Sequence, residues 1–195
     1  NALIESQQER LSAWSREFGG AVRYCLYNGN TPTSPPPADV QRKSPEQVLS
    51  RAALRSSPPP ILVTNSTMLE YMLVRQDDQP ILTKSQGKLK WVVLDEAHTY
   101  VGSNAAEIAM LLRRVMHSFD VKPSDVRFIA TSATIGSGDA ETLAELRTFL
   151  ADVAGVDQSQ VHVITGHRKI PSLENEPGSA LETIDQIMGY SSLEP

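Results

Sequence analysis

The sequence predicts an α/β domain with a mostly parallel sheet covered by helices on both faces, and three observations support this class. First, four of five predicted strands are almost continuously apolar, which is typical of strands buried on both faces. Second, helical patterns alternate with the strands, as crossover connections between parallel strands require. Third, polar residues follow three strands, at the sheet edge where such folds bind ligands. The five runs are VRYCLY (22–27), ILVT (61–64), WVVLD (91–95), VRFIA (126–130) and VHVIT (161–165).

The helices are predicted from apolar spacing and from capping signals. Residues sharing one face of a first helix are Leu3, Gln7, Leu11, Trp14 and Phe18. Capping patterns predict three further starts, at Ser44-Pro45-Glu46-Gln47, at Thr67-x-x-Glu70 and at Asn104-x-x-Glu107. A last helix follows Asp139, with an inward face of Leu143, Leu146, Leu150 and Val153. The proline-rich segment 31–43 is predicted to be a surface loop.

Composition limits the classes of protein. With 195 residues, 40% of them hydrophobic, the chain can bury the core of one globular domain, with or without a tail. The single cysteine, Cys25, excludes an internal disulfide and a cysteine-based zinc cluster, which suits a cytoplasmic protein. No apolar run is long enough to span a membrane, so no membrane partner is expected. The net charge of −5 implies that any contact with nucleic acid is local.

Two carboxylates, Asp95 and Glu96, stand together at the end of the run WVVLD. An unpaired carboxylate away from water is expensive, so the pair is expected at the rim of a cleft or beside a cation. An Asp at the tip of a buried strand is well placed to bind Mg²⁺, usually through water, while the ion bridges nucleotide phosphates. A Glu one residue later can orient and deprotonate a water aimed at the terminal phosphate. The alternative is a solvated Asp-Glu turn.

With His98 the acidic pair becomes Asp-Glu-Ala-His (95–98), and the sequence then resembles the first RecA-like lobe of a superfamily 2 DEAD/DEAH-box helicase. Ser132-Ala133-Thr134 follows the run VRFIA as that family's Ser-Ala-Thr motif follows its own strand. The stretch ILVTNSTMLEYML (61–73) is similar to the segment before the acidic box in large prokaryotic DEAH-type helicases of repair or defence. The opening NALIESQ and the turn at 27–31 also resemble family elements.

The resemblance implies a three-layer RecA-like fold of the P-loop NTPase type. Residues 1–168 would form part of the first lobe and residues 169–195 a connector to the next region of the protein. The whole protein would be an ATP-dependent helicase or translocase that uses ATP and Mg²⁺. Its partners would be a nucleic acid, expected to be DNA, and a second RecA-like lobe of the same chain. Because the sequence has neither an initiator Met nor a signal peptide, it is interpreted as an internal piece of a longer protein.

The resemblance also assigns roles to residues. Asp95 would hold Mg²⁺ through water, and Glu96 would act on the attacking water. His98 would link the acidic box to Ser132 and Thr134, coupling hydrolysis to nucleic-acid binding. The residues expected to contact nucleic acid are Thr64, Asn65, Gly29, Asn1 and Gln7.

Each of these roles has a plainer alternative. His98 could belong to a structural polar network, and Ser132 and Thr134 could cap a turn. Thr64 and Asn65 could form an ordinary entry into a helix. For Asn1, Gln7 and Gly29 the alternatives are a frayed end, a helix surface and a turn glycine.

The sequence also departs from the family. It has no phosphate-cradling Gly-x-x-x-x-Gly-Lys-Thr/Ser loop, because Gly87-Lys88 lacks the first glycine and 136–138 lacks the lysine. The chain therefore holds half of an ATPase site and alone is expected not to turn over ATP. Two alternatives stay open: a non-catalytic nucleic-acid-binding or interaction module derived from a helicase lobe, and an unrelated metal hydrolase built on residues 95, 96 and 98. The second leaves the Ser-Ala-Thr motif unexplained.

Overall fold

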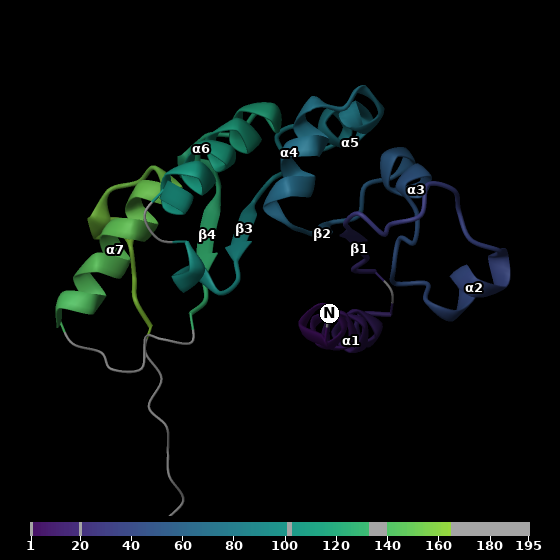
Figure 1. Cartoon of the computed structure of the whole chain (residues 1–195). Helices are drawn as coiled ribbons and strands as arrows, with labels where there is room; N and C mark the ends of the chain where they lie inside the picture. Colours follow the sequence, from purple (N-terminus) through teal and green to yellow (C-terminus); the bar gives the residue numbers. More distant parts are fainter. Residues whose placement is uncertain (1, 20, 101–102, 133–139, 165–195) are drawn as a thin grey trace, which may run out of the picture. The chain divides into compact units, whose positions relative to one another are not determined.

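The computed structural model describes residues 2–19, 21–100, 103–132 and 140–164 (Figure 1). All of them belong to the first of two contact units, Asn1–Ile164 and Thr165–Pro195. The predicted connector 169–195 and its boundary lie outside the described residues. Within these ranges, no helix combines the length and apolarity that a membrane span requires.

Helices and strands alternate through most of the described chain. The strands are β1 (Tyr24–Tyr27), β2 (Ile61–Thr64), β3 (Trp91–Leu94) and β4 (Arg127–Ala130). The α-helices are α1 (Ala2–Glu17), α2 (Ala38–Lys43), α3 (Arg51–Ser56), α4 (Ser66–Val74), α5 (Gln79–Lys84), α6 (Ser103–Ser118) and α7 (Ala140–Ala154). Short 3₁₀ turns are η1 (Gln76–Asp78), η2 (Ala97–Thr99), η3 (Pro123–Asp125) and η5 (Gln158–Gln160).

The strands form two parallel pairs. β1 pairs with β2, from Tyr24 opposite Ile61 to Tyr27 opposite Thr64. β3 pairs with β4, and the register ends with Leu94 opposite Ala130 (Figure 1). Four predicted strands and their parallel direction are therefore confirmed. Since parallel strands end at the same edge, the residues after β3 and β4 are brought together, as are those after β1 and β2.

The fifth predicted strand is wrong in its described part, residues 161–164. Val161 is buried, but its N–H donates to the carbonyl oxygen of Gln158 at 3.1 Å, which closes the turn η5. Ile164 is 90% exposed. An apolar run without a neighbouring strand to receive its backbone hydrogen bonds stays irregular.

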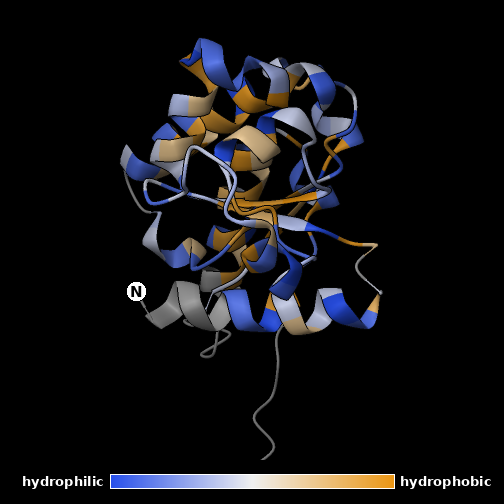
Figure 2. Cartoon of the chain, turned by 90° about the vertical axis from the view of Figure 1, so that its right-hand side faces the viewer, coloured by the Kyte–Doolittle hydropathy of each residue, from blue (hydrophilic) through white to orange (hydrophobic). Residues whose placement is uncertain are grey.

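One hydrophobic cluster joins both strand pairs to the helices. Cys25 and Tyr27 of β1, Leu94 of β3, and the buried face of α6 all belong to it. Hydrophobic residues concentrate in the strands (Figure 2). Among the described residues, however, only one face of β3–β4 is covered: Val93 is 61% exposed and Trp91 is 53% exposed. The expected cover on both faces is therefore incomplete in this part of the chain.

The predicted helix starts are wrong by a few residues. α3 begins after Ser50, whose hydroxyl accepts the N–H of Ala53 at 3.2 Å. Residues 44–47 form a turn, in which the N–H of Gln47 donates to the carbonyl oxygen of Ser44. A side chain of this turn, Glu46, is fully buried and cannot close a capping box at a helix surface.

Two other helices also start at residues other than the predicted ones. α4 begins after Asn65, whose side-chain oxygen accepts the N–H of Met68 at 2.8 Å, so Thr67 lies inside the helix. α6 begins at Ser103, so Asn104 also lies inside its helix. The segment predicted as a loop at 31–43 contains the short helix α2 from Ala38 onward, because its prolines end at Pro37.

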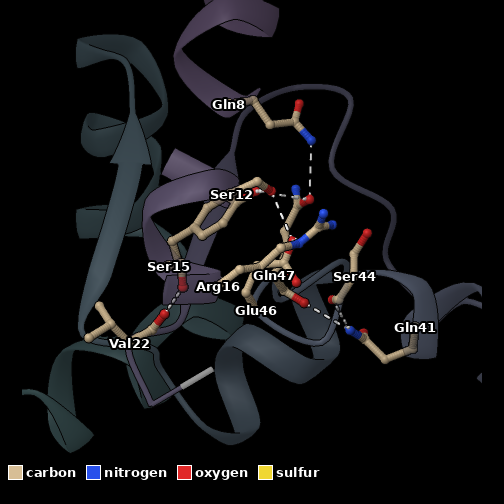
Figure 3. A network of polar contacts seen from close by, with 10 residues as sticks. Gln8, Ser12, Ser15, Arg16, Val22, Gln41, Ser44, Glu46 and Gln47 are labelled. Atoms are coloured by element: carbon tan, nitrogen blue, oxygen red, sulfur yellow. Dashed lines mark hydrogen bonds and ion pairs between the residues drawn. The ribbon is translucent and has the colours of Figure 1, made fainter. Parts of the chain in front are cut away.

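In its described part, helix α1 packs on the domain through polar contacts, and two residues of its predicted apolar face are exposed. Ser12 donates to Glu46 Oε1 at 2.9 Å and lies 2.7 Å from the hydroxyl of Tyr24 (Figure 3). Arg16 forms an ion pair with Glu46 at 2.9 Å. Trp14 and Phe18 point away, and are 44% and 50% exposed. The apolar spacing indicated the helix correctly but the wrong side of it, because polar partners at 44–47 are distant in sequence.

Candidate nucleotide and nucleic-acid site

Thr131 joins the two carboxylate-bearing residues at the end of β3. Its hydroxyl donates to Asp95 Oδ1 at 2.5 Å and lies 3.3 Å from the backbone N–H of Glu96, which donates to it. The backbone of Thr131 extends the strand pairing, since its N–H donates to the oxygen of Leu94 and its oxygen accepts the N–H of Ala97. Adjacent parallel strands thus bring the acidic turn and the residue before Ser132 into direct contact.

Glu96 adopts a left-handed backbone conformation, with φ 52° and ψ 46°. For a residue with a Cβ this conformation costs about 1–2 kcal/mol, so surrounding contacts must hold it. The contacts include the bond to Thr131 and the hydroxyl of Thr99, which donates to the Glu96 carbonyl oxygen at 2.9 Å. The chain turns sharply out of β3 here, and the Glu96 side chain stays 43% exposed.

His98 lies between the acidic turn and the end of β4. Its Nδ1 is 3.2 Å from Glu96 Oε2 and 3.5 Å from the hydroxyl oxygen of Ser132. The first contact is an ion pair when the imidazole is protonated. His98 therefore contacts two other predicted site residues, Glu96 and Ser132, whereas Thr134 lies outside the described residues.

Asp95 offers a carboxylate oxygen ligand for Mg²⁺ at the end of β3. It is exposed at the carboxyl end of β3, and carboxylate oxygens are the ligands that Mg²⁺ prefers. Among the described residues no group of three or more His, Cys, Asp or Glu side chains could hold a metal ion. The donor set fits an ion that a single carboxylate and a nucleotide hold together.

The carboxyl ends of β1 and β2 place a second set of predicted residues together. Thr64 donates its hydroxyl proton to the carbonyl oxygen of Tyr27 at 2.7 Å, so this proton is already engaged. Asn65 uses its side-chain oxygen to cap α4. The NH₂ group of the same side chain can donate hydrogen bonds to other partners. Both residues are thus part of the helix entry as well as candidates for phosphate contact.

The turn that contains Gly29 is held by Arg51, which the sequence did not single out. The Arg51 guanidinium donates to the carbonyl oxygens of Asn28 at 3.3 Å, Gly29 at 3.2 Å and Thr31 at 2.9 Å. A Cβ at Gly29 would meet nothing within 4 Å, and its φ is not positive, so the backbone does not require glycine there. Asn1 lies outside the described residues, and of Gln7 only the backbone, within α1, is described.

A buried ionic network lies at the carboxyl end of β1. The hydroxyl of Tyr27 donates to Asp78 Oδ2 at 2.5 Å, and Arg55 pairs with Asp78 Oδ1 at 2.8 Å. Asp78 is fully buried, and burial together with its hydrogen bond raises the pKa of Tyr27. The network links η1 to β1 and α3, so the loop after β1 rests on a satisfied charge pair.

Two residues of this geometry, Thr131 and Arg51, are absent from the predicted site. A signal existed for Thr131, because it directly precedes Ser132 and carries a hydroxyl at a strand end. None existed for Arg51, which is 22 residues from Gly29 by sequence number.

The chain matches the family described as DEAD/DEAH box helicase over residues 1–143, well over half of its length. It belongs to the DEAD/DEAH box helicase family. The resemblance first seen in the acidic box is therefore confirmed, and so is the α/β, RecA-like fold class.

Two curated relatives and one solved structure support the same family. The helicase-family chain is 32% identical over 152 residues to the Druantia protein DruE of Escherichia coli (strain UMEA 4076-1), covering 74% of the chain and 8% of DruE. It is 27% identical over 178 residues to the ATP-dependent helicase YprA of Bacillus subtilis (strain 168), covering 90% of the chain and 21% of YprA. The crystal structure of the DUF1998 helicase MrfA is similar with a TM-score of 0.52 and 25% identity, over 80% of the chain and 20% of MrfA. The chain thus spans a small part of each relative.

Proposed function

We propose that this chain is part of the motor of an ATP-dependent helicase or translocase that acts on nucleic acid, with DNA as the substrate. The observation that carries the proposal is the acidic turn 95–98, held against Thr131 and Ser132 at the ends of two adjacent parallel strands. Membership of the helicase family supports it. A cytoplasmic location and a second RecA-like lobe belong to the same proposal.

The geometry supports distinct roles for the two carboxylates. Asp95 would hold the Mg²⁺ that arrives with ATP, and this ion would neutralise charge on the phosphates. Glu96, turned away from the strand direction, would orient a water and accept its proton. Its side chain is 43% exposed beside His98, which suits a base that must reach a ligand.

His98 is placed to transmit a change between the two ends of the site. Its Nδ1 contacts both the Glu96 carboxylate and the Ser132 hydroxyl. Nucleic-acid binding that shifts the chain after β4 would therefore move His98, and His98 is the contact partner of Glu96, the proposed base. Thr134 would belong to the same link.

Nucleic acid would lie across the carboxyl ends of β1 and β2. The amide of Asn65, the backbone at Gly29 and the first N–H groups of α4 are suited to phosphate oxygens. Thr64 would act mainly by holding the strand end, because its proton is engaged by Tyr27. Asn1 and Gln7 would extend this contact surface.

The chain itself has no phosphate-binding loop, so ATP turnover needs further segments of the full-length protein. The test is phosphate release by the full-length protein, with and without single-stranded or duplex DNA, beside its Glu96→Gln variant. Removal of the base is expected to lower the DNA-stimulated rate by about 100-fold or more. RNA oligonucleotides in the same assay test the choice of substrate.

A matched control is Glu145→Gln, which removes an exposed carboxylate from α7 and should leave the rate unchanged. If Glu96→Gln hydrolyses ATP as fast as the unmodified protein, Glu96 is not the base. If the unmodified protein binds DNA but releases no phosphate, the chain is a non-catalytic binding module in a helicase fold.

A further inference from the structure

Thr131 makes contacts that the family motifs do not assign. One hydroxyl group serves both residues of the acidic pair: it donates to the Asp95 side chain and accepts from the Glu96 backbone. The donated bond is short, at 2.5 Å. Thr131 therefore fixes the direction of one carboxylate and the backbone from which the other projects.

The position of the hydroxyl has a chemical consequence for Asp95. A carboxylate rotates about its last bond unless a hydrogen bond fixes it, and the bond at Oδ1 defines the orientation of Oδ2 as well. A fixed carboxylate meets a cation without a further loss of rotamer freedom, which is the general benefit of preorganisation.

The position also matters for Glu96, because its left-handed conformation is costly and must be held. The Glu96 N–H donates to the Thr131 hydroxyl on one side, while Thr99 donates to the Glu96 carbonyl on the other. Without the Thr131 hydroxyl, the backbone of Glu96 loses one of these two bonds to side chains.

We propose that Thr131 is a positioning residue for Mg²⁺–ATP hydrolysis, acting through its hydroxyl on both Asp95 and Glu96. The proposal rests on the proposed function. The backbone of Thr131 forms its strand-like hydrogen bonds independently of the side chain, and the side chain is exposed. The hydroxyl can therefore be removed without disturbing the core.

The experiment compares Thr131→Val and Thr131→Ser in the full-length protein, with Thr83→Val as the matched control. Val keeps the shape and removes the hydroxyl, whereas Ser keeps the hydroxyl. Thr83 is an exposed threonine of α5 whose hydroxyl bonds a helix carbonyl. DNA-stimulated kcat is measured over a range of Mg²⁺ concentrations at saturating ATP, together with the melting temperature.

Thr131→Val is expected to lower kcat by about 10- to 100-fold, the range for losing a hydrogen bond to a charged group. It should also raise the Mg²⁺ concentration needed for half-maximal rate, at an unchanged melting temperature. Thr131→Ser should restore both quantities, and Thr83→Val should change neither.

Two results overturn the proposal while the proposed function stands. If Thr131→Val lowers kcat only together with the melting temperature, and the Mg²⁺ requirement stays constant, the hydroxyl is merely structural. If Thr131→Val equals the unmodified protein while Glu96→Gln is inactive, the motor stands and Thr131 has no positioning role. An unmodified protein without Glu96-dependent hydrolysis overturns the proposed function itself, and the role of Thr131 falls with it.

Discussion

His98 shows at the scale of a single residue how the site could link its parts. The ring contacts Glu96 through the same Nδ1 atom that faces Ser132. One nitrogen cannot donate to both partners with full strength, so a small movement of either changes the other contact. This shared atom supports the coupling role proposed for His98.

His98→Ala should therefore reduce the stimulation of hydrolysis by DNA more than the basal rate. The loss of coupling is expected to be about 5- to 100-fold in the ratio of stimulated to basal rate, since coupling free energies are commonly of that size. Phosphate release by the full-length protein at zero and saturating DNA gives the ratio. His117→Ala removes an exposed imidazole at the end of α6 and is the control. Unchanged stimulation in His98→Ala would contradict the coupling role.

At the scale of elements, the start of α4 has two roles. Asn65 caps the helix there, and the same residue is a candidate for contact with nucleic acid. Asn65 caps the helix through its side-chain oxygen, whereas contact with a phosphate would use the amide N–H groups. The two roles therefore depend on different atoms of the same side chain. A substitution that changes only one end can separate them.

Asn65→Asp keeps the capping oxygen but removes the N–H donors and adds a negative charge. It should leave α4 intact and weaken DNA binding by about tenfold, because a donor to a charged group is lost. Asn65→Ala should in addition loosen the first turn of α4, seen as faster hydrogen exchange at residues 66–70. Fluorescence anisotropy with single-stranded DNA measures the affinity, and Asn104→Asp, at an exposed residue of α6, controls for the added charge. Equal affinity of Asn65→Asp and the unmodified protein would leave only the capping role.

The elements also show what the sequence could predict. Strands β1 to β4 were predictable because each is a compact apolar run beside a chain turn, and their polar ends indicated the site at Asp95 and Glu96. Helix starts were less predictable, because several Ser, Thr and Asn residues near a helix start can each act as its cap. The structure selects Ser50 and Asn65, which directly precede the first turn of each helix.

Contacts between distant segments were not predictable from one sequence. The packing side of α1 depends on Glu46, which lies 30 residues beyond its partner Arg16. Similarly, Arg51 holds a turn that ends 20 residues earlier, at Thr31. Spacing rules act over one or two helical turns, so they identify a helix but not the polar partner that selects its buried face.

At the scale of the whole described unit, one core connects the two parallel strand pairs. Cys25 lies in this core at 0% exposure, and its neighbours in the cluster include residues of β3 and α6. Burial raises the pKa of its thiol from 9.0 to about 11. Because the thiolate is the reactive form, the rate at which Cys25 is alkylated shows whether the core around it is closed.

Cys25 should react with iodoacetamide in the native protein at least about 100-fold more slowly than in the unfolded protein at pH 8, since a pKa raised by two units lowers the thiolate fraction by that factor. Burial slows the reaction further, so labelling requires opening of β1.

The native pKa of the Cys25 thiol exceeds the ordinary value, so the folded state binds this proton more tightly. The stability due to it is complete below pH 9 and is lost as the pH rises towards about 11. Labelling should therefore accelerate over that interval more steeply in the native than in the unfolded protein. Mass spectrometry of the Cys25 peptide from full-length protein measures both rates, with guanidinium-unfolded protein as the reference. Equal native and unfolded rates at pH 8 would show that β1 does not lie in a closed core.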